Sequence, residues 1–291
     1  MVVPPIPIHR ALWMQNRSTA QTMCCIVNVN LFPVRCLHMP SPLNDALSVF
    51  SARACAAPLE DASKLFTAST GIGVDISVCA RHCATPEAEE ADPESGTHDF
   101  LQEIAEDGYH DLSISGAEYL LDDGEVRKIV LRGERRLIAY RESALVVPKG
   151  NPANIRSLAD LARPGARVGI SVIDCLKGLW EDVSGRAGLA GDIRPNITFH
   201  ATGCVAIVEA VCEGLVDAAF GWSAFEHLGE GCLEVVPLPP EHRVYRGTGI
   251  GMLSFSKKPD EARDFMDFLV TPEARACYKR YGWVLPEELR G

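Results

Sequence analysis

The amino-acid sequence predicts an α/β protein of two lobes, each with a mostly parallel sheet flanked by helices. Strand-length apolar runs alternate with helical segments from residue 47 to residue 281. This alternation is typical of parallel sheets that are covered on both faces. Two consecutive extended segments near residue 140 interrupt the alternation before it starts again. The chain has 291 residues, of which 47% are hydrophobic, and this is enough for two lobes with cores of their own.

The first series of elements occupies residues 47–138. Pro58 stands in the first turn of a predicted helix, with Glu60 and Asp61 near the positive end of the helix dipole, and Gly71 ends that helix. A polar loop rich in acidic residues follows the second strand, at 79–96. We expect strands at 47–50, 74–78 and 111–114, and helices at 58–69, 99–105 and 117–122.

The second series follows two extended segments, 137–140 and 143–147. Near its end, Thr271, Pro272 and Glu273 have the composition of a helix N-terminus and separate the last two helices. We expect helices at 155–161, 176–185, 205–213, 260–269 and 272–281, and strands at 167–170, 197–200, 218–222, 234–238 and 249–255.

These elements divide the chain into a leader and two lobes. Residues 1–46 contain many prolines and little periodicity, so we expect an irregular or disordered leader. Asn28 and Asn30 interrupt its weakly apolar stretch, so we find no convincing signal peptide. Lobe 1 is expected to combine residues 47–138 with 245–291, and lobe 2 to hold residues 139–244.

The composition and the motifs exclude several classes of function. The net charge of −11 and the absence of a Lys/Arg cluster argue against nucleic acid and anionic membranes as partners. No apolar run approaches the roughly 18 residues that cross a bilayer. The sequence has no G-x-S-x-G elbow, phosphate loop, H-E-x-x-H helix or C-x-x-C dithiol, so it gives no support for catalysis by these groups.

A series of short phrases occurs in one order along residues 47–285. The most specific is Leu-Val-Val-Pro-Lys-Gly-Asn-Pro at 145–152. The others include Val-Phe-Ser-Ala at 49–52, Asp-Leu-Ser-Ile-Ser-Gly-Ala at 111–117, Asp-Ala-Ala-Phe-Gly-Trp at 217–222, Ser-Lys-Lys-Pro at 256–259 and Tyr-Gly-Trp at 281–283. As a set they resemble the substrate-binding proteins of ABC importers, specifically the molybdate/tungstate-binding type.

This resemblance implies the type II periplasmic-binding-protein fold, with two hinge crossovers and a ligand cleft between the lobes. Crossovers near 137–143 and 238–247 fit the sequence. It also implies a binding protein without catalysis, which captures a small inorganic ligand by lobe closure and delivers it to an ABC transporter permease. We expect a monomer in the periplasm or facing the cell exterior. A cytoplasmic location stays open because no signal peptide is evident.

Family members hold a tetrahedral oxyanion with hydroxyls and with backbone N–H groups at helix N-termini. In this chain cysteines stand in or beside the corresponding turns, each after a predicted strand. The predicted ligand or metal residues are Cys55, Cys79, Cys83, Cys175 and Cys204. The residues predicted to balance charge or line the cleft are Arg53, Arg81, His82, Lys177 and Trp222. His82 could equally be a solvated loop residue, and Trp222 a core residue.

Thiolates make poor neighbours for an oxyanion, because like charges 4 Å apart repel by about 4 kcal/mol at an effective dielectric of 20. Cysteine is instead a preferred ligand of zinc, copper(I) and iron–sulfur clusters. We therefore expect an iron–sulfur cluster or a thiophilic metal ion in the cleft. One alternative is a molybdate/tungstate-type oxyanion site with incidental cysteines. Another is a cytoplasmic metal or redox sensor, or a thiol enzyme, on the same fold.

The remaining cysteines are expected outside the cleft. Three stand among apolar residues at helix or strand spacing and are predicted to be buried core thiols: Cys212, Cys232 and Cys277. The three cysteines of the leader receive no role. A local disulfide between Cys79 and Cys83 is an alternative to metal binding if the protein is exported.

Overall fold

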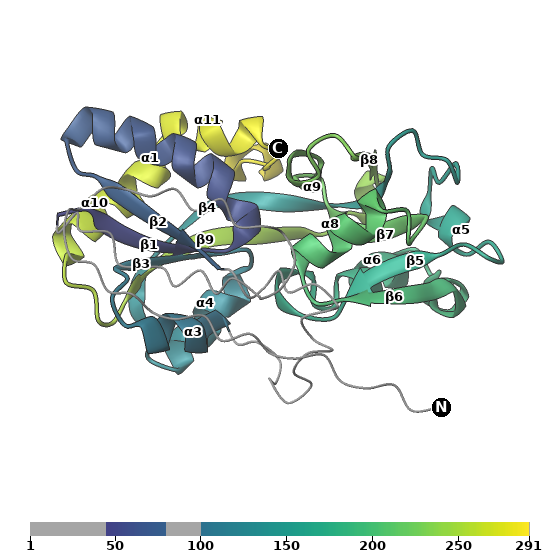
Figure 1. The fold of residues 1–291 in the computed structure, drawn as a ribbon, viewed down its shortest axis with the longest axis horizontal. Coiled ribbons are helices and arrows are strands. Elements are labelled where there is room, and N and C mark those ends of the chain that lie inside the picture. The colour runs from purple at the N-terminus through teal and green to yellow at the C-terminus, as the bar shows by residue number, and fades with distance from the viewer. Residues whose placement is uncertain (1–44, 80–99, 291) are drawn as a thin grey trace, which may run out of the picture. The chain divides into compact units, whose positions relative to one another are not determined.

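The computed structural model describes residues 45–79 and 100–290 (Figure 1). These residues belong to one compact unit, Leu43–Gly291. The predicted leader up to residue 44 and most of the predicted acidic loop, 80–96, lie outside the described residues. None of the helices described is both long and apolar enough to cross a membrane.

The strands of the described chain form one mixed sheet. Their bounds are β1 Leu47–Ser51, β2 Val74–Val78, β3 Leu112–Ser115, β4 Val130–Pro148, β5 Val168–Ser171, β6 Ile197–Ala201, β7 Ala218–Trp222, β8 Leu233–Pro237 and β9 Tyr245–Leu253. Their order across the sheet is β2-β1-β3-β9-β4-β7-β5-β6, and β8 pairs with β4. The predicted α/β class is confirmed.

Parallel and antiparallel pairings have separate places in this sheet. β1 is parallel to β2 and to β3, and β5 is parallel to β6 and to β7. β4 and β9 run antiparallel to each other and to their other neighbours. The antiparallel pairings therefore come from the two segments that were expected to cross between the lobes.

β4 is a single strand of 19 residues, where the sequence predicted two extended segments. Register shifts between Val130 and Arg135, and between Leu137 and Ala139, let it follow β9 without ending. Its first part pairs with β9, and from Ser143 onward it pairs with β7. One strand thus joins two groups of partners. The predicted lobe boundaries near 138 and 244 stay a prediction.

The helices alternate with the strands. Their bounds are α1 Ala56–Thr70, α3 Phe100–Asp107, α4 Glu118–Val126, α5 Leu158–Leu161, α6 Leu179–Arg186, α7 Ala190–Ile193, α8 Cys204–Cys212, α9 Phe225–Leu228, α10 Pro259–Leu269 and α11 Pro272–Arg280. Short 3₁₀ helices include η1 Arg53–Cys55 and η3 Asp174–Leu176. Figure 1 shows α1 and α11 on one face of the β1–β3 region and α3 and α4 on the other.

Two helices are shorter than predicted, for local backbone reasons. α6 starts at Leu179 and not at residue 176, because Gly178 has a φ of 72° and separates it from η3. α5 starts at Leu158 and not at residue 155, because Ser157 and Asp160 form a capping box there. At the end of α1, Gly71 adopts a φ of 78° as expected of a helix stop.

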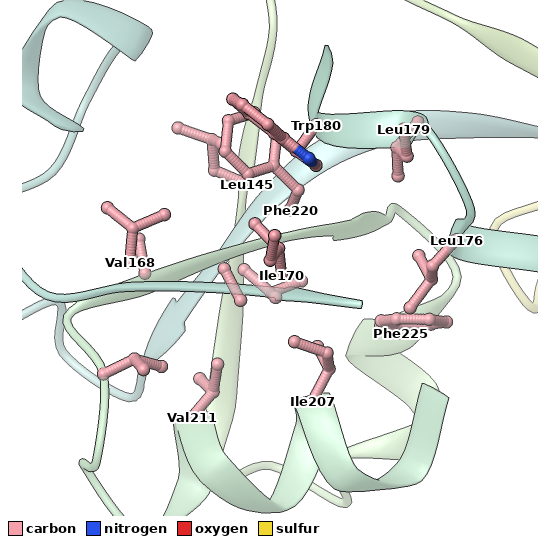
Figure 2. Close-up of a cluster of buried hydrophobic side chains, with 14 of the residues drawn as sticks. Leu145, Val168, Ile170, Leu176, Leu179, Trp180, Ile207, Val211, Phe220 and Phe225 are labelled. Atoms are coloured by element: carbon pink, nitrogen blue, oxygen red, sulfur yellow. The ribbon is translucent and has the colours of Figure 1, made fainter. Parts of the chain in front are cut away.

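Separate hydrophobic clusters lie on the two groups of strands. Figure 2 shows the one around β5 and β7, where Ile207 and Val211 of α8 pack toward Val168, Ile170 and the strands beside them. A second cluster lies between β1, β9 and the helices α1, α10 and α11, and includes Phe66, Phe265 and Cys277. The two cores hold the strand ends in fixed positions, which matters for the site below.

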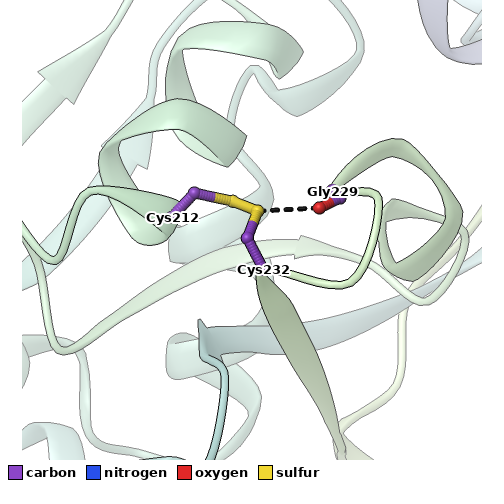
Figure 3. Close-up of a disulfide and its surroundings, with 3 residues drawn as sticks. All are labelled: Cys212, Gly229 and Cys232. Carbon is purple, nitrogen blue, oxygen red and sulfur yellow. Dashed lines mark hydrogen bonds between the residues drawn. A yellow bond between two sulfur atoms is a disulfide. The ribbon is translucent and has the colours of Figure 1, made fainter.

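Two of the three cysteines predicted as core thiols form a disulfide. Cys212 at the end of α8 is bonded to Cys232 just before β8, and Cys232 also contacts the Gly229 carbonyl (Figure 3). Both are half-buried, so the prediction of buried thiols is wrong for this pair. The apolar residues around these cysteines pack against the core, but the turn after α8 places the two sulfurs at the edge of that core. Cys277 is fully buried, as predicted.

Candidate functional site

A small cavity opens at the carboxyl ends of four strands. Its lining includes residues that come after each of these strands: Ala52, Arg53 and Ala54 after β1, Gly116 after β3, Asp174 and Cys175 after β5, and Cys204 after β6. The other lining residues are Phe100, Leu120 and Arg141. In open α/β sheets, ligands bind outside the carboxyl ends of the strands. The cavity volume is about 30 Å³, compared with the roughly 10–15 Å³ that one buried water needs. It has room for a small solute.

Helix N-termini surround this cavity. α8 begins at Cys204 itself, α4 begins two residues after Gly116, and α1 begins directly after η1. Backbone N–H groups at such ends are not used inside the helix, and the helix dipole makes them a favourable place for oxygen atoms that carry negative charge. The backbone therefore supplies hydrogen-bond donors from several elements to one small space.

Arg141 is a cationic residue of the cavity lining, and it is completely buried. Its Nη1 donates to Cys175 Sγ at 3.1 Å, and its guanidinium carbon lies 4.8 Å from the centre of the Trp222 ring. Nε and Nη2 have no hydrogen-bond partner among the described residues. Buried charges are normally paired and fully hydrogen-bonded. Arg141 therefore keeps two nitrogen donors that no described residue satisfies.

Gly116 is what lets the guanidinium lie so close to the β3–α4 turn. A Cβ atom on Gly116 would come 2.7 Å from Arg141 Nη2 and 3.0 Å from Nη1. Side-chain carbons essentially never approach so closely without something shifting. The glycine of the sequence phrase at 111–117 therefore has a physical role, because it makes room for the buried cation.

Cys175 and Cys204 form a pair of sulfur atoms beside Arg141. Their Sγ atoms lie 3.1 Å apart. The hydrogen bond from Cys204 lowers the pKa of Cys175 to about 5, and the charge of Arg141 adds to this, although burial acts in the opposite direction. The same hydrogen bond raises the pKa of the Cys204 thiol, as does its burial. These directions make Cys175 the more acidic sulfur of the pair and the one that would carry its negative charge.

This thiolate and Arg141 largely neutralise each other. Burial by itself would lower the pKa of Arg141, but the charge of Cys175 raises it above its ordinary value. Arg141 lines the cavity, and its Nε and Nη2 have no hydrogen-bond partner among the described residues. The site can therefore hold a small solute by hydrogen bonds and, through sulfur, by direct bonding.

The structure places only part of the predicted cysteine set together. Cys55 is the last residue of η1 and is fully buried, and burial raises its pKa to about 12. Cys79 is buried beside Phe50 and Phe100, and its thiol donates to Glu103. Neither lines the cavity, whereas Cys175 and Cys204 do. Cys83 lies outside the described residues.

The residues predicted to balance charge or line the cleft also lie in different places. Arg53 lines the cavity. Trp222 is fully buried beneath Arg141. Lys177 is exposed, and its carbonyl accepts a hydrogen bond from Arg246. Arg81 and His82 lie outside the described residues.

Across residues 45–79 and 100–290, no three His, Cys, Asp or Glu side chains are grouped so that they could hold a metal ion. The pair Cys175–Cys204 alone is too small a ligand set for the tetrahedral or cuboidal centre that four cysteines would make. The predicted iron–sulfur cluster or thiophilic metal ion therefore stays a prediction. It would need ligands from the segment that contains Cys83.

Sequence reasoning missed the central residue, Arg141. The sequence pattern predicts a gap between two extended segments at this position, whereas Arg141 lies inside β4. A charged residue between the apolar stretches at 137–140 and 143–147 was the available signal, because strands with two buried faces rarely hold an unpaired charge. Arg246 of β9 was missed for the same reason.

The strand topology, the cavity at the strand ends and the buried donors define an α/β protein that binds a small ligand. The sequence matches the family described as bacterial extracellular solute-binding protein over residues 47–284, and the chain belongs to this family. This match confirms the prediction that the chain is a binding protein. A search of curated proteins finds no match.

Solved structures share the fold. They include PEB3 of Campylobacter jejuni (20% identity, TM-score 0.63, covering 82% of this chain and 99% of that one). The periplasmic molybdate-binding protein of Azotobacter vinelandii is similar too (19%, 0.63, 82% and 99%). A third is the substrate-binding domain of a putative molybdenum ABC transporter from Clostridium difficile (12%, 0.61, 82% and 98%). At these identities the likeness concerns the fold.

Proposed function

We propose that this protein is the solute-binding component of an ABC-type importer and that it captures a small oxygen-bearing inorganic solute beside Arg141. The observation that carries the proposal is the pair of Arg141 donors, Nε and Nη2, which are buried and have no partner among the described residues. Leaving a buried donor unsatisfied costs about 1–3 kcal/mol, and more when the group is charged. A solute oxygen at this position would relieve that cost.

The surroundings of Arg141 favour an oxygen ligand of small size. The N-terminal ends of α4 and α8 border the same cavity, and their backbone N–H groups suit oxygen acceptors. The volume of about 30 Å³ suits a group of a few heavy atoms. Among the proteins of this fold, a PEB3 structure holds L-phospholactate and the Azotobacter protein binds molybdate. Molybdate and the phosphoryl group of phospholactate both carry oxygens around a central atom.

The disulfide supports a role outside the cytoplasm. Disulfides persist in oxidising compartments such as the periplasm and are rare in the cytosol. Cys212–Cys232 is such a bond, and the family is extracellular by its description. A receptor in that compartment would deliver its solute to a permease in the membrane. The partner proposed here is therefore the permease of an ABC transporter.

The test is a binding screen on the full chain. Molybdate, tungstate, sulfate, phosphate and arsenite would each be added to the purified protein, and the unfolding temperature would be measured. A ligand at 100 times its Kd stabilises the folded state by about 2.7 kcal/mol, which raises the unfolding temperature measurably. Arg141→Met should abolish the rise, because it removes the donors and keeps a long apolar side chain.

Arg136→Met is the matched control on the same strand. Arg136 pairs with Asp267 away from the cavity, so this variant should keep the full ligand response. Calorimetry on the same three proteins gives the affinity directly. No response to any member of the panel, or an equal response in both variants, would refute the proposed function.

A further inference from the structure

Cys175 and Cys204 come from two different strand ends and meet at the cavity. Cys175 lies in η3, after β5, and Cys204 is the first residue of α8, after β6. Cys175 is 4% exposed, whereas Cys204 is half-buried, and both line the cavity. The neighbouring donor, Arg141, is buried, and its Nε and Nη2 have no partner within residues 45–79 and 100–290. The two sulfurs and the guanidinium thus face the same small space.

The distance between the sulfurs discriminates among the centres they could bind. A bond from thiolate sulfur to a soft centre is about 2.3 Å long, so a linear two-coordinate ion needs sulfurs about 4.6 Å apart and a tetrahedral ion needs about 3.8 Å. The observed separation is 3.1 Å, which with such bonds subtends an angle of about 85° at the centre. Angles near 90° are those of a pyramidal trivalent centre with a lone pair.

We propose that Cys175 and Cys204 are a dithiol site for the trivalent oxyacid of a heavier group 15 element, such as arsenite or antimonite, and that Arg141 donates to the oxygen left on that centre. This inference rests on the proposed function and names the substrate class of the same site. Such a solute uses both the sulfurs and the N–H donors of the cavity, which a tetrahedral oxyanion cannot do. Sulfur bonds the central atom, and the N–H donors bind its oxygen.

The bonding step balances without any change of oxidation state. Cys175 sulfur bonds the central atom, one hydroxide leaves, and the Cys204 proton converts it to water. Cys204 sulfur then bonds the same atom, and the second hydroxide takes a proton from solvent. In total the acid E(OH)₃, one thiolate, one thiol and one proton from solvent give (RS)₂E–OH and two waters. One S–H and two E–O bonds break, and two E–S and two O–H bonds form.

The ionisation of the pair supports this order of events. Cys175 is the thiolate, which is the nucleophilic form of cysteine, and Cys204 holds the proton that the first leaving hydroxide needs. After both bonds form, the site has lost the negative charge that neutralised Arg141. The guanidinium is then free to donate to the remaining oxygen.

The test uses the full chain with its thiols reduced and sodium arsenite as the probe. After gel filtration, elemental analysis should find one arsenic per chain, and thiol titration should show two thiols fewer. X-ray absorption should show two sulfurs and one oxygen around arsenic. Cys204→Ser and Cys175→Ser should each lose arsenic retention. Cys277→Ser removes a buried thiol in the other core and should retain arsenic fully.

Cys204→Ser is the decisive variant, because this half-buried position should accept serine without unfolding, and its unfolding temperature verifies that. Arsenic retained equally by both cleft variants would overturn the inference. The inference would also be overturned if arsenite were not retained while molybdate bound tightly and equally well to both serine variants. That result would leave the proposed function standing. Failure of the whole panel would instead remove the proposed function.

Discussion

Arg141 of β4 and Arg246 of β9 are paired directly opposite each other in the antiparallel ladder. Both lie over Trp222, at 4.8 Å and 5.8 Å from the ring centre. Arg246 donates to Asp182 at 2.9 Å and to the Cys175 and Lys177 carbonyls. Among the described residues, the hydrogen-bond partner of Arg141 is the sulfur of Cys175 alone. Like charges placed opposite each other destabilise a sheet, so this pair is costly unless a ligand also contacts Arg141.

Gly116→Ala is expected to weaken solute binding by displacing Arg141. The new methyl group would come 2.7 Å from Arg141 Nη2, so the guanidinium must move. A shift of this size spoils the hydrogen bonds of the free donors, and a bound solute should lose about tenfold in affinity, equivalent to about 1.4 kcal/mol. Calorimetry with the best ligand of the screen measures it. Gly185→Ala, at a glycine with open space around it, should change nothing.

The thiolate of Cys175 should make stability depend on pH. Its pKa is lowered from 9.0 to about 5 in the folded state. The unfolded chain therefore binds the proton that the folded chain lacks between these values, and stability rises with pH across this window. The contribution is complete above pH 9 and is lost as the pH falls through about 5. Cys55, whose pKa is raised to about 12, acts in the opposite sense above pH 9.

Denaturant unfolding of the protein and of Cys175→Ala, from pH 5 to pH 8.5, measures this dependence. The stability difference between them should grow with pH in favour of the unmodified chain. Thiolate absorbance in the ultraviolet should also show one group that titrates near pH 5, absent from the variant. A pH-independent difference would show that Cys175 is not ionised. Cys277→Ala controls for the loss of a buried thiol elsewhere.

Removing the disulfide should lower stability without affecting the site. Cys212 and Cys232 are 20 residues apart, and closing a loop of this length in the unfolded chain contributes about 3 kcal/mol in the chain-entropy account. The double variant Cys212→Ala/Cys232→Ala should unfold at correspondingly lower denaturant. Because neither residue lines the cavity, the affinity for the solute should stay the same. An unchanged stability would contradict the disulfide.

Asp111 should be a major contributor to the stability of the β1–β3 region. This buried carboxylate accepts hydrogen bonds from the Ser256 hydroxyl and from the Lys257 and Lys258 N–H groups at one oxygen, and from the Ser48 N–H at the other. Hydrogen bonds to charged groups contribute about 1.5–3 kcal/mol each and are not additive. Asp111→Ala should therefore cost about 3 kcal/mol in denaturant unfolding.

The exposed Asp123→Ala is the control for Asp111→Ala. Asp123 sits on α4 and pairs with Arg127 at the surface, where such ion pairs contribute about 0–1 kcal/mol. Equal losses in the two variants would show that the Asp111 contacts do not hold the region together. The Asp111 contacts also explain the sequence phrase at 256–259, whose backbone wraps around this carboxylate.

The alternating elements could be predicted because each depends on local sequence. β2 at Val74–Val78 and β7 at Ala218–Trp222 have the predicted bounds, since β-branched residues in β2 and aromatic residues in β7 favour a strand locally. The end of α1 at Gly71 follows from glycine's access to positive φ. β4 was not predicted as one strand, because its continuity depends on pairing with β9, more than 100 residues away.

The site was predictable in part. The turns after strands were expected to meet, and two of the five cysteines, Cys175 and Cys204, do line one cavity. Cys55 and Cys79 come from turns of the same kind but point into packed interiors. Whether a turn residue faces a cavity or a core depends on backbone direction after the strand, and no local pattern specifies it.

By itself, the sequence determined the α/β class, the order of the elements, the family resemblance and the thiols near the strand ends, because periodicity, caps and turn residues act over a few positions. Only the tertiary structure decided that Arg141 is buried without a full set of partners from the described part of the chain, that Cys175 and Cys204 meet at 3.1 Å, and that Cys212 pairs with Cys232. These facts depend on which distant segments the sheet brings together. The chemistry of the cavity arises from those contacts.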